Sequence, residues 1–190
     1  MQKIMFNDRY HHTNAVIEER KTRATQIMAG IFFPVNMVMG RVLPDKDGKI
    51  YAVANGENII VKLRYKVGEV VAVAQCYNDV VREFTDLAFV PGSTNKMFVR
   101  ADLMPHQIRI IGIRCERLRD ISDEECIKEG VYAGSQALEY PYYFIDTKQF
   151  LICDYKSPRE AFAALIDKVS GRGTWDRNPW VVVYEFELVK

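Results

Sequence analysis

Three segments rich in apolar and β-branched residues constrain the fold of this chain more than any other feature. They are Glu69–Cys76, Gln107–Leu118 and Trp180–Val189. The first is nearly continuous in small and β-branched residues, as in a strand buried on both faces, and the last alternates between apolar and polar. No regular succession of helices separates the three, which argues against a doubly wound fold. The pattern favours an α+β domain with a mixed, mostly antiparallel sheet or small barrel and peripheral helices.

Weaker signals predict further strands and one irregularity. The apolar positions of the second segment shift by one residue around Ile110 and Ile111, which indicates a β-bulge near Gly112 or burial on both faces. The pair Asn55-Gly56 lies between β-prone stretches and predicts a hairpin turn. Short strands are also expected at Lys3–Phe6 and Met97–Arg100.

Two short helices are predicted from capping signals. Thr13–Glu19 is a candidate with Thr13 as its N-cap. Ser122 and Glu125 form the S-x-x-E pattern of a capping box, and Gly130 stands where a glycine commonly ends a helix. A helix is therefore expected over residues 122–129.

A third and longer helix is predicted over Ser157–Val169. Ser157 is its N-cap, Pro158 occupies the first helical position, and Glu160 completes another capping box. The apolar side chains recur at the spacing of one helical face, so this stripe is expected in the core. The stripe consists of Phe162, Leu165, Ile166 and Val169.

The composition is that of one ordinary globular domain, which we expect to span residues 1–190. Hydrophobic residues make up 48% of the chain, which is enough for one core. The formal net charge is +1, so no overall positive field attracts nucleic acid. No apolar run resembles a signal peptide or reaches the length of a membrane span. A cytoplasmic protein without membrane contact is expected.

No cofactor or metal site is expected from the sequence. The four cysteines form no CxxC pair, and none has metal-ligand spacing with a histidine, so they are interpreted as buried free thiols in a reducing compartment. His11, His12 and His106 form no credible site. The cysteines are Cys76, Cys115, Cys126 and Cys153.

Four sequence blocks occur in an order that is informative when they are taken together. They are Arg20-Lys21-Thr22-Arg23; Tyr65-Lys66-Val67-Gly68-Glu69; Met104-Pro105 through Arg109 and Leu118–Ser122 to Glu129-Gly130; and Trp175–Val181. In this order they resemble the ASCH family of PUA-like folds, in a form common among phage and prophage proteins. The resemblance implies a PUA-like β-barrel with helices at its rim.

The resemblance also implies a candidate catalytic pair. Some small ASCH proteins are amidohydrolases that remove an acyl group from a modified cytidine with a Lys, a Thr and a Glu. By motif, the Lys falls on Lys21 and the Glu on Glu129. The Thr falls on Ala24, which has no hydroxyl, and Thr25 comes one place later. If the family cleft is present, the heads of Lys21 and Glu129 should lie within one hydrogen bond or one bridging water.

The first block and one tryptophan are candidate binding residues. Arg20, Lys21, Thr22 and Arg23 could position a phosphate, or they could form an ordinary solvated loop. Trp175 could stack on a base, although packing at the edge of the core is the more common role of such a residue.

Three functional hypotheses follow from these observations. The first is a domain that binds RNA or a modified nucleoside in a cleft beside Lys21 and Glu129. The second is a small amidohydrolase that uses the same cleft, which the alanine at position 24 weakens. The third is a phage accessory protein with a vestigial cleft and a protein partner.

Overall fold

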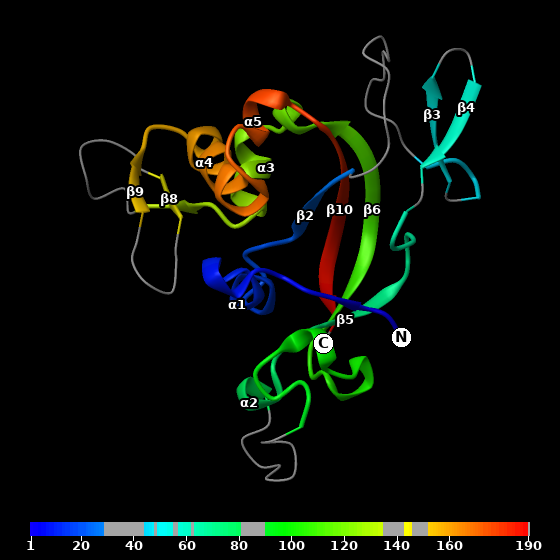
Figure 1. Cartoon of the computed structure of the whole chain (residues 1–190), viewed down its shortest axis with the longest axis vertical. Helices are drawn as coiled ribbons and strands as arrows, with labels where there is room; N and C mark the ends of the chain where they lie inside the picture. The colour runs from blue at the N-terminus through cyan, green and yellow to red at the C-terminus, as the bar shows by residue number, and fades with distance from the viewer. Residues whose placement is uncertain are drawn as a thin grey trace.

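The fold is described from a computed structural model of the chain. The structure describes residues 1–28, 44–47, 49–54, 57–61, 63–80, 90–134, 143–145 and 152–189. Within them lies a mixed α+β architecture with a mostly antiparallel central sheet (Figure 1).

The central sheet has five strands in the order β1, β5, β6, β10 and β2. Their bounds are Lys3–Ile4 for β1, Val70–Val73 for β5, Gln107–Arg117 for β6, Trp180–Val189 for β10 and Arg23–Ile27 for β2. β1 and β5 run parallel, and the other neighbours are antiparallel. The three segments that were predicted as strands of one sheet are therefore confirmed, with the first shorter than expected.

The long pair β6–β10 contains the predicted bulge. Glu185 lies opposite Gly112, but the next residue, Phe186, lies opposite Ile110. Ile111 is thus the extra residue, and it is 51% exposed. In the described part of the chain the sheet is open, with β1 and β2 at its two edges, although β6 and β10 are strongly curved (Figure 1).

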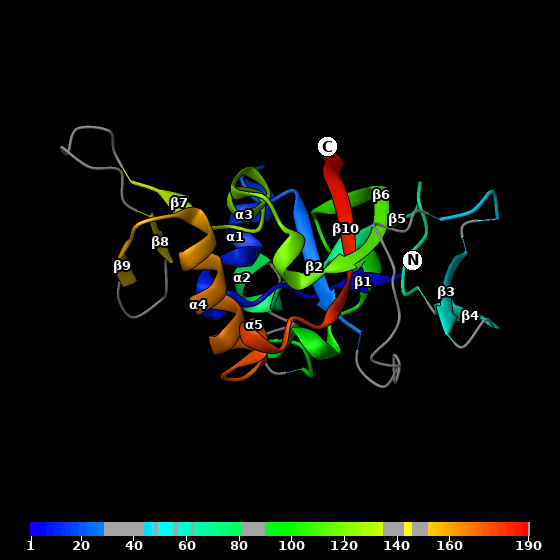
Figure 2. The same ribbon diagram turned by 90° about the horizontal axis from the view of Figure 1, so that it is seen from above.

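Two smaller sheets flank the central one. The hairpin of β3 (Ile50–Ala54) and β4 (Glu57–Val61) is antiparallel, as predicted, and its turn residues lie outside the described residues. β7 (Tyr132–Ala133), β8 (Tyr143–Ile145) and β9 (Ile152–Tyr155) form a three-stranded sheet beyond the helices (Figure 2).

The short helices follow their capping residues, with two corrections. α3 (Asp123–Lys128) begins at Ser122 with the complete predicted capping box. α1 (His12–Ile17) begins after His11, so Thr13 lies inside the helix, and its hydroxyl donates to Asp8 at 2.5 Å instead of capping the helix. The strand expected at residues 97–100 is wrong: the side chain of Asn95 caps a 3-10 helix over Lys96–Phe98. Within the described residues, the remaining short helices are α2 (Tyr77–Val80), α5 (Thr174–Arg177) and the 3-10 helices Asp8–Tyr10, Ala101–Leu103 and Leu118–Asp120.

The longest described helix, α4 (Pro158–Ser170), buries most of its predicted stripe. Phe162, Leu165 and Ile166 are buried, but Val169 is 44% exposed. The prediction for Val169 is wrong because this residue lies at the rim of a cavity beside the last turn of the helix. Within the described residues, no helix combines the length and apolar character needed to cross a membrane.

The core lies on both faces of β10. Val182, Tyr184 and Phe186 belong to one apolar cluster, with residues of β1, β5 and β6. Val181 and Val183 belong to a second cluster, which includes the buried face of α4. β2 pairs with β10 at the edge of the sheet, and its residues Ala24, Thr25 and Gln26 line a cavity together with residues of α4. Of the predicted buried thiols, Cys115 and Cys126 are buried and Cys76 is half-buried; the side chain of Cys153 lies outside the described residues.

Candidate functional site

The first block of the sequence, Arg20–Arg23, leads directly into an edge strand, β2. β2 pairs with β10 from Arg23 opposite Glu185 to Ile27 opposite Val181. Ahead of the strand, the Thr22 amide donates to the Lys128 carbonyl at the end of α3. Because alternate residues of a strand share a face, positions 21, 23 and 25 point to one side, toward the C-terminus of α3.

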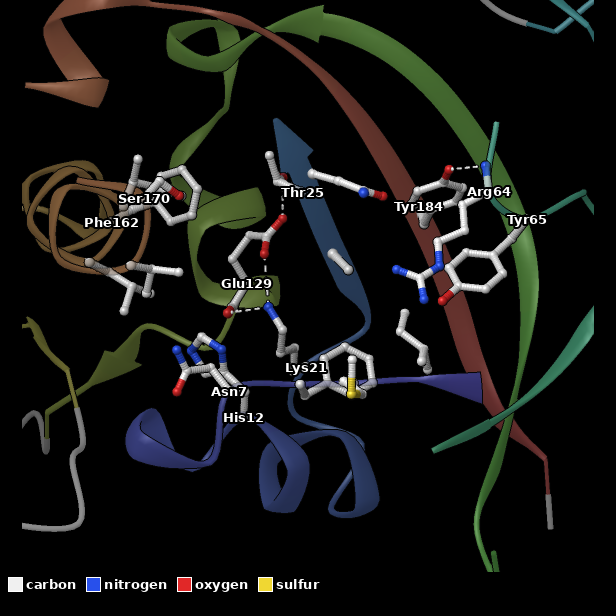
Figure 3. A pocket seen from close by; sticks show the side chains of 18 residues that line it. Asn7, His12, Lys21, Thr25, Arg64, Tyr65, Glu129, Phe162, Ser170 and Tyr184 are labelled. Carbon is white, nitrogen blue, oxygen red and sulfur yellow. Dashed lines mark hydrogen bonds and ion pairs between the residues drawn. The ribbon is translucent and has the colours of Figure 1, made fainter. Parts of the chain in front are cut away.

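Lys21 and Glu129 meet at this point, as predicted, although 108 positions separate them. The Lys21 Nζ atom lies 2.8 Å from Oε2 of Glu129 and also donates to the Glu129 main-chain oxygen at 2.5 Å (Figure 3). Lys21 is 3% exposed and Glu129 is 4% exposed. The pair is therefore a buried ion pair, and the ammonium group also caps the C-terminal end of α3.

Thr25 supplies the hydroxyl that the family pattern placed one residue earlier. Its Oγ1 donates to Oε1 of Glu129, the carboxylate oxygen that Lys21 does not contact (Figure 3). The expectation that the site lacks a hydroxyl because position 24 is alanine is therefore wrong. Strand alternation is the signal that would have found Thr25, because it shares a face with Lys21 whereas Ala24 does not.

Arg23 lies in the interior, so it does not contribute to a surface that could contact phosphate. It is 1% exposed, and its guanidinium contacts three carboxylates. The group pairs with Glu116, with Glu125 at 2.7 Å and with Glu129 at 3.2 Å. Within the first motif only Arg20 is exposed; it pairs with Glu18 and lies over the Tyr132 ring at 4.4 Å.

A cavity of about 300 Å³ opens beside the Lys21–Glu129 pair. This volume is at the lower end of the range for small-molecule sites, which are mostly apolar with a few placed polar groups. Its apolar wall comes from β1, α4, β10 and nearby residues: Ile4, Met5, Phe6, Ala24, Tyr65, Phe162, Leu165, Ile166, Val169 and Tyr184. Its polar lining consists of Asn7, His12, Lys21, Thr25, Gln26, Arg64, Glu129 and Ser170 (Figure 3).

Burial and charge shift the titration of both members of the pair. Burial lowers the pKa of Lys21 below its ordinary value, although the neighbouring Glu129 acts to raise it. Burial acts to raise the pKa of Glu129, but attraction to Lys21 and Arg23 and hydrogen bonds from Lys21 and Thr25 hold it below its ordinary value. Glu129 is consequently an anion at neutral pH, next to an ammonium group that loses its proton more easily than an exposed lysine.

His12 is a cavity residue that the sequence did not reveal. Burial and the positive charges of Lys21 and Lys96 lower its pKa to about 2, so the imidazole is neutral. Gly130 makes room for it: a Cβ atom at that glycine would lie 3.3 Å from Cδ2 of His12, and its φ of +103° is one that other residues rarely adopt. The sequence carried no signal for this contact, because it depends on how α1 docks against α3.

Trp175 is not among the residues that line this cavity. It lies in α5, half-buried, with its ring edge-on to Phe162 at a centroid distance of 6.1 Å. The guanidinium groups of Arg119 and Arg159 lie 6.0 and 5.5 Å from its ring centre. The structure therefore places the predicted stacking residue apart from the Lys21–Glu129 site, in a packed position.

The fold and the site define an α+β domain with a buried lysine–glutamate pair at a small cavity. In the part of the chain that the structure describes, no three His, Cys, Asp or Glu residues gather as metal ligands would. Comparisons with protein-family models, curated proteins and solved structures gave no match.

Proposed function

We propose that the chain is a PUA-like ASCH domain that acts as a small amidohydrolase on an acylated nucleoside bound in this cavity. One observation carries the proposal. The Glu129 carboxylate accepts hydrogen bonds from the Lys21 ammonium group and the Thr25 hydroxyl, beside a cavity of about 300 Å³. These are the three side-chain types that the resemblance assigns to catalysis.

The burial of the pair supports a functional role over a purely structural one. Removing two charges from water costs several kcal/mol per ion, and an apolar pair of similar volume often stabilises a fold better. Buried ionisable groups with shifted pKa values beside a cavity are typical of functional sites. Lys21 and Glu129 meet both conditions. The capping of α3 by Lys21 is a structural benefit that an uncharged donor could also supply.

The geometry supports a specific order of proton transfers. Glu129 accepts the proton of the Thr25 hydroxyl, and the hydroxyl oxygen attacks the acyl carbon of the substrate. Lys21 donates a proton to the leaving nitrogen as the carbon–nitrogen bond breaks. Water then attacks the resulting ester on Thr25 and gives a proton to the neutral Lys21 amine, while the protonated Glu129 returns its proton to the Thr25 oxygen. The carboxylic acid leaves, and Thr25, Lys21 and Glu129 regain their starting protonation states. The lowered pKa of Lys21 makes it a stronger proton donor than an exposed lysine.

Further support comes from the order of the four motif blocks and from the sheet. The strong curvature of β6 and β10 is compatible with a PUA-like barrel (Figure 1). Blocks one and three, which are distant in sequence, supply Lys21 and Glu129 to one site.

A second candidate function is binding of RNA or a modified nucleoside without hydrolysis. The observation in its favour is that both oxygens of Glu129 are already engaged by cations, Lys21 on one and Arg23 on the other. A carboxylate held in this way has a lowered pKa and is a weaker base.

The test is incubation of the protein with cytidine acylated on its exocyclic amine, followed by chromatography of the products. Lys21→Met and Glu129→Gln keep the size of each side chain and remove the charge. Lys168→Met, at an exposed position of α4 that does not line the cavity, is the matched control. Hydrolysis by the wild type and by Lys168→Met, lost in both charge variants, is expected.

Two other results would redirect the assignment. Ligand binding without hydrolysis in the wild type would favour the second candidate. Ligand binding that is unchanged in both charge variants would remove the cavity from the function and favour the hypothesis of a protein partner. Thermal unfolding of each variant shows whether it is folded, so that loss of activity is not confused with loss of structure.

A further inference from the structure

Arg64 occupies the wall of the cavity opposite the Lys21–Glu129 pair. It follows β4 in the chain, and its guanidinium points into the cavity (Figure 3). It is exposed at the cavity mouth. None of the ion pairs among the described residues includes it, in contrast to Lys21 and Arg23, which are matched by glutamates.

Neighbouring aromatic residues hold Arg64 in place. Its amide donates to the Tyr184 hydroxyl at 3.0 Å, and its guanidinium carbon lies 5.5 Å from the centre of the Tyr65 ring. The Tyr65 hydroxyl in turn donates to the Lys3 carbonyl at 3.1 Å, and the two tyrosine rings pack edge to face at 5.3 Å. A guanidinium supported on an aromatic face retains donors for a further partner.

The cavity therefore has two unlike ends. At one end, the charges of Lys21 and Glu129 offset each other. At the other end, Arg64 presents a positive charge that no described carboxylate offsets. An anionic group on a ligand would receive paired, charge-assisted hydrogen bonds from a guanidinium in this position.

We propose that Arg64 determines ligand specificity by binding an anionic substituent, a phosphate or a carboxylate, at the end of the ligand remote from Lys21 and Glu129. This inference rests on the proposed function and adds to it: the preferred ligand is a nucleotide or a comparable nucleoside acid, and an uncharged nucleoside binds less tightly. The ligand is anchored at its anionic end by Arg64 and presents its reactive end to the buried pair.

The test is calorimetric titration with three compounds: cytidine, cytidine 5′-monophosphate and the cytidine analogue with a 5′-carboxylate. None carries an acyl group, so turnover does not interfere. The wild type is expected to bind the monophosphate about tenfold more tightly than cytidine, which corresponds to one charge-assisted contact. Comparison of the monophosphate with the carboxylate shows which anion the site prefers.

Arg64→Gln is expected to abolish this preference, so that the monophosphate and cytidine bind this variant with equal affinity, whereas Arg64→Lys retains part of it. Lys66→Gln is the matched control, because Lys66 is exposed nearby but does not line the cavity. The inference is overturned if cytidine and both anions bind the wild type equally, or if the preference survives in Arg64→Gln. In those cases cytidine binding still supports the proposed function. If no compound binds, both the inference and the proposed function fail.

Discussion

At the scale of single residues, Thr25 distinguishes a catalytic site from a binding site. Its hydroxyl donates to Glu129 and also lines the cavity. If this oxygen is the nucleophile, Thr25→Ser should retain hydrolysis within about tenfold, and Thr25→Val should lose at least about 100-fold in kcat/KM. Steady-state hydrolysis of the acylated cytidine measures both values. Equal activity of Thr25→Val and the wild type would show that water, and not Thr25, attacks the substrate.

The buried His12 imidazole makes the stability of the folded protein depend on pH, and this dependence can be measured without a ligand. Its pKa is about 2 in the folded protein, against an ordinary value of 6.5. Between these values the unfolded chain binds a proton that the folded protein does not bind. Stability is therefore retained above pH 6.5 and falls as the pH decreases below it, by up to about 1.4 kcal/mol per pH unit.

Urea unfolding between pH 6.5 and 5 is expected to show this slope, because most carboxylates remain ionised in that range. His12→Gln lacks a titratable group at this buried position and should have a flatter profile. Parallel profiles for the wild type and His12→Gln would contradict the burial of a neutral imidazole at this position.

The site residues differ in how far the sequence could reveal them. Lys21 and Glu129 were predicted to meet because motif resemblance connected two distant segments, and they do meet. Thr25 could have been found from strand alternation, but the block ahead of it was interpreted as a phosphate-binding cluster or a solvated loop, and not as the start of a strand. His12 and Arg64 carried no local signal, because only the docking of α1 and of the chain after β4 brings them to the cavity.

At the scale of elements, Arg23 joins β2 to β6 and α3 through Glu116, Glu125 and Glu129. Arg23→Gln should destabilise the protein by about 3–5 kcal/mol, because buried carboxylates lose their counter-charge. Denaturant titration at neutral pH measures the loss. Arg20→Gln is the control: this residue is exposed and its ion pair with Glu18 contributes at most about 1 kcal/mol. Equal free energies of unfolding for Arg23→Gln and Arg20→Gln would mean that the ion pairs of Arg23 contribute little to the stability of the fold.

The apolar stripe of α4 lines the cavity along its length, and it runs from buried positions to a partly exposed position at the rim. Phe162 is 1% exposed and packs against Trp175, so Phe162→Ala should cost about 3–5 kcal/mol of unfolding free energy. Val169→Ala should cost less than about 1 kcal/mol, because that side chain is partly exposed at the cavity rim. Urea unfolding of Phe162→Ala and Val169→Ala measures the two losses of unfolding free energy. A cost below about 1 kcal/mol for Phe162→Ala would place this face of α4 outside the core.

Elements with strong local signals were predicted well, and elements stabilised by distant partners were not. Ser122 and Ser157 begin their helices as expected, because side-chain capping is a local interaction. β2 was missed because Lys21 just ahead of it and Arg23 at its start are charged, and charged residues indicate solvent unless their glutamate partners are known. The strand expected at Met97–Arg100 was wrong for a different reason: four residues carry too little pattern to decide, and the Asn95 side chain caps a 3-10 helix over Lys96–Phe98.

At the scale of the whole molecule, the balance of charge separates binding of a nucleotide from binding of a polymer. The net charge is +1, and two cations of the first motif are buried with glutamates. The remaining cation of that motif, Arg20, is paired with Glu18. A cavity of about 300 Å³ can hold one nucleotide-sized ligand but no length of chain.

We therefore expect single-stranded RNA to bind no more tightly than a mononucleotide, with contact from Arg64 and few other cations. Each phosphate contact contributes about −0.7 to the slope of log K against log salt for single strands, so a slope between about 0 and −2 is expected. Fluorescence anisotropy of a labelled oligonucleotide between low and moderate salt measures it. Arg64→Gln should reduce the slope by about one contact, because that guanidinium lies exposed at the cavity mouth. A slope steeper than about −5 would require a basic surface elsewhere, and the arginines around Trp175 would then be the first residues to substitute.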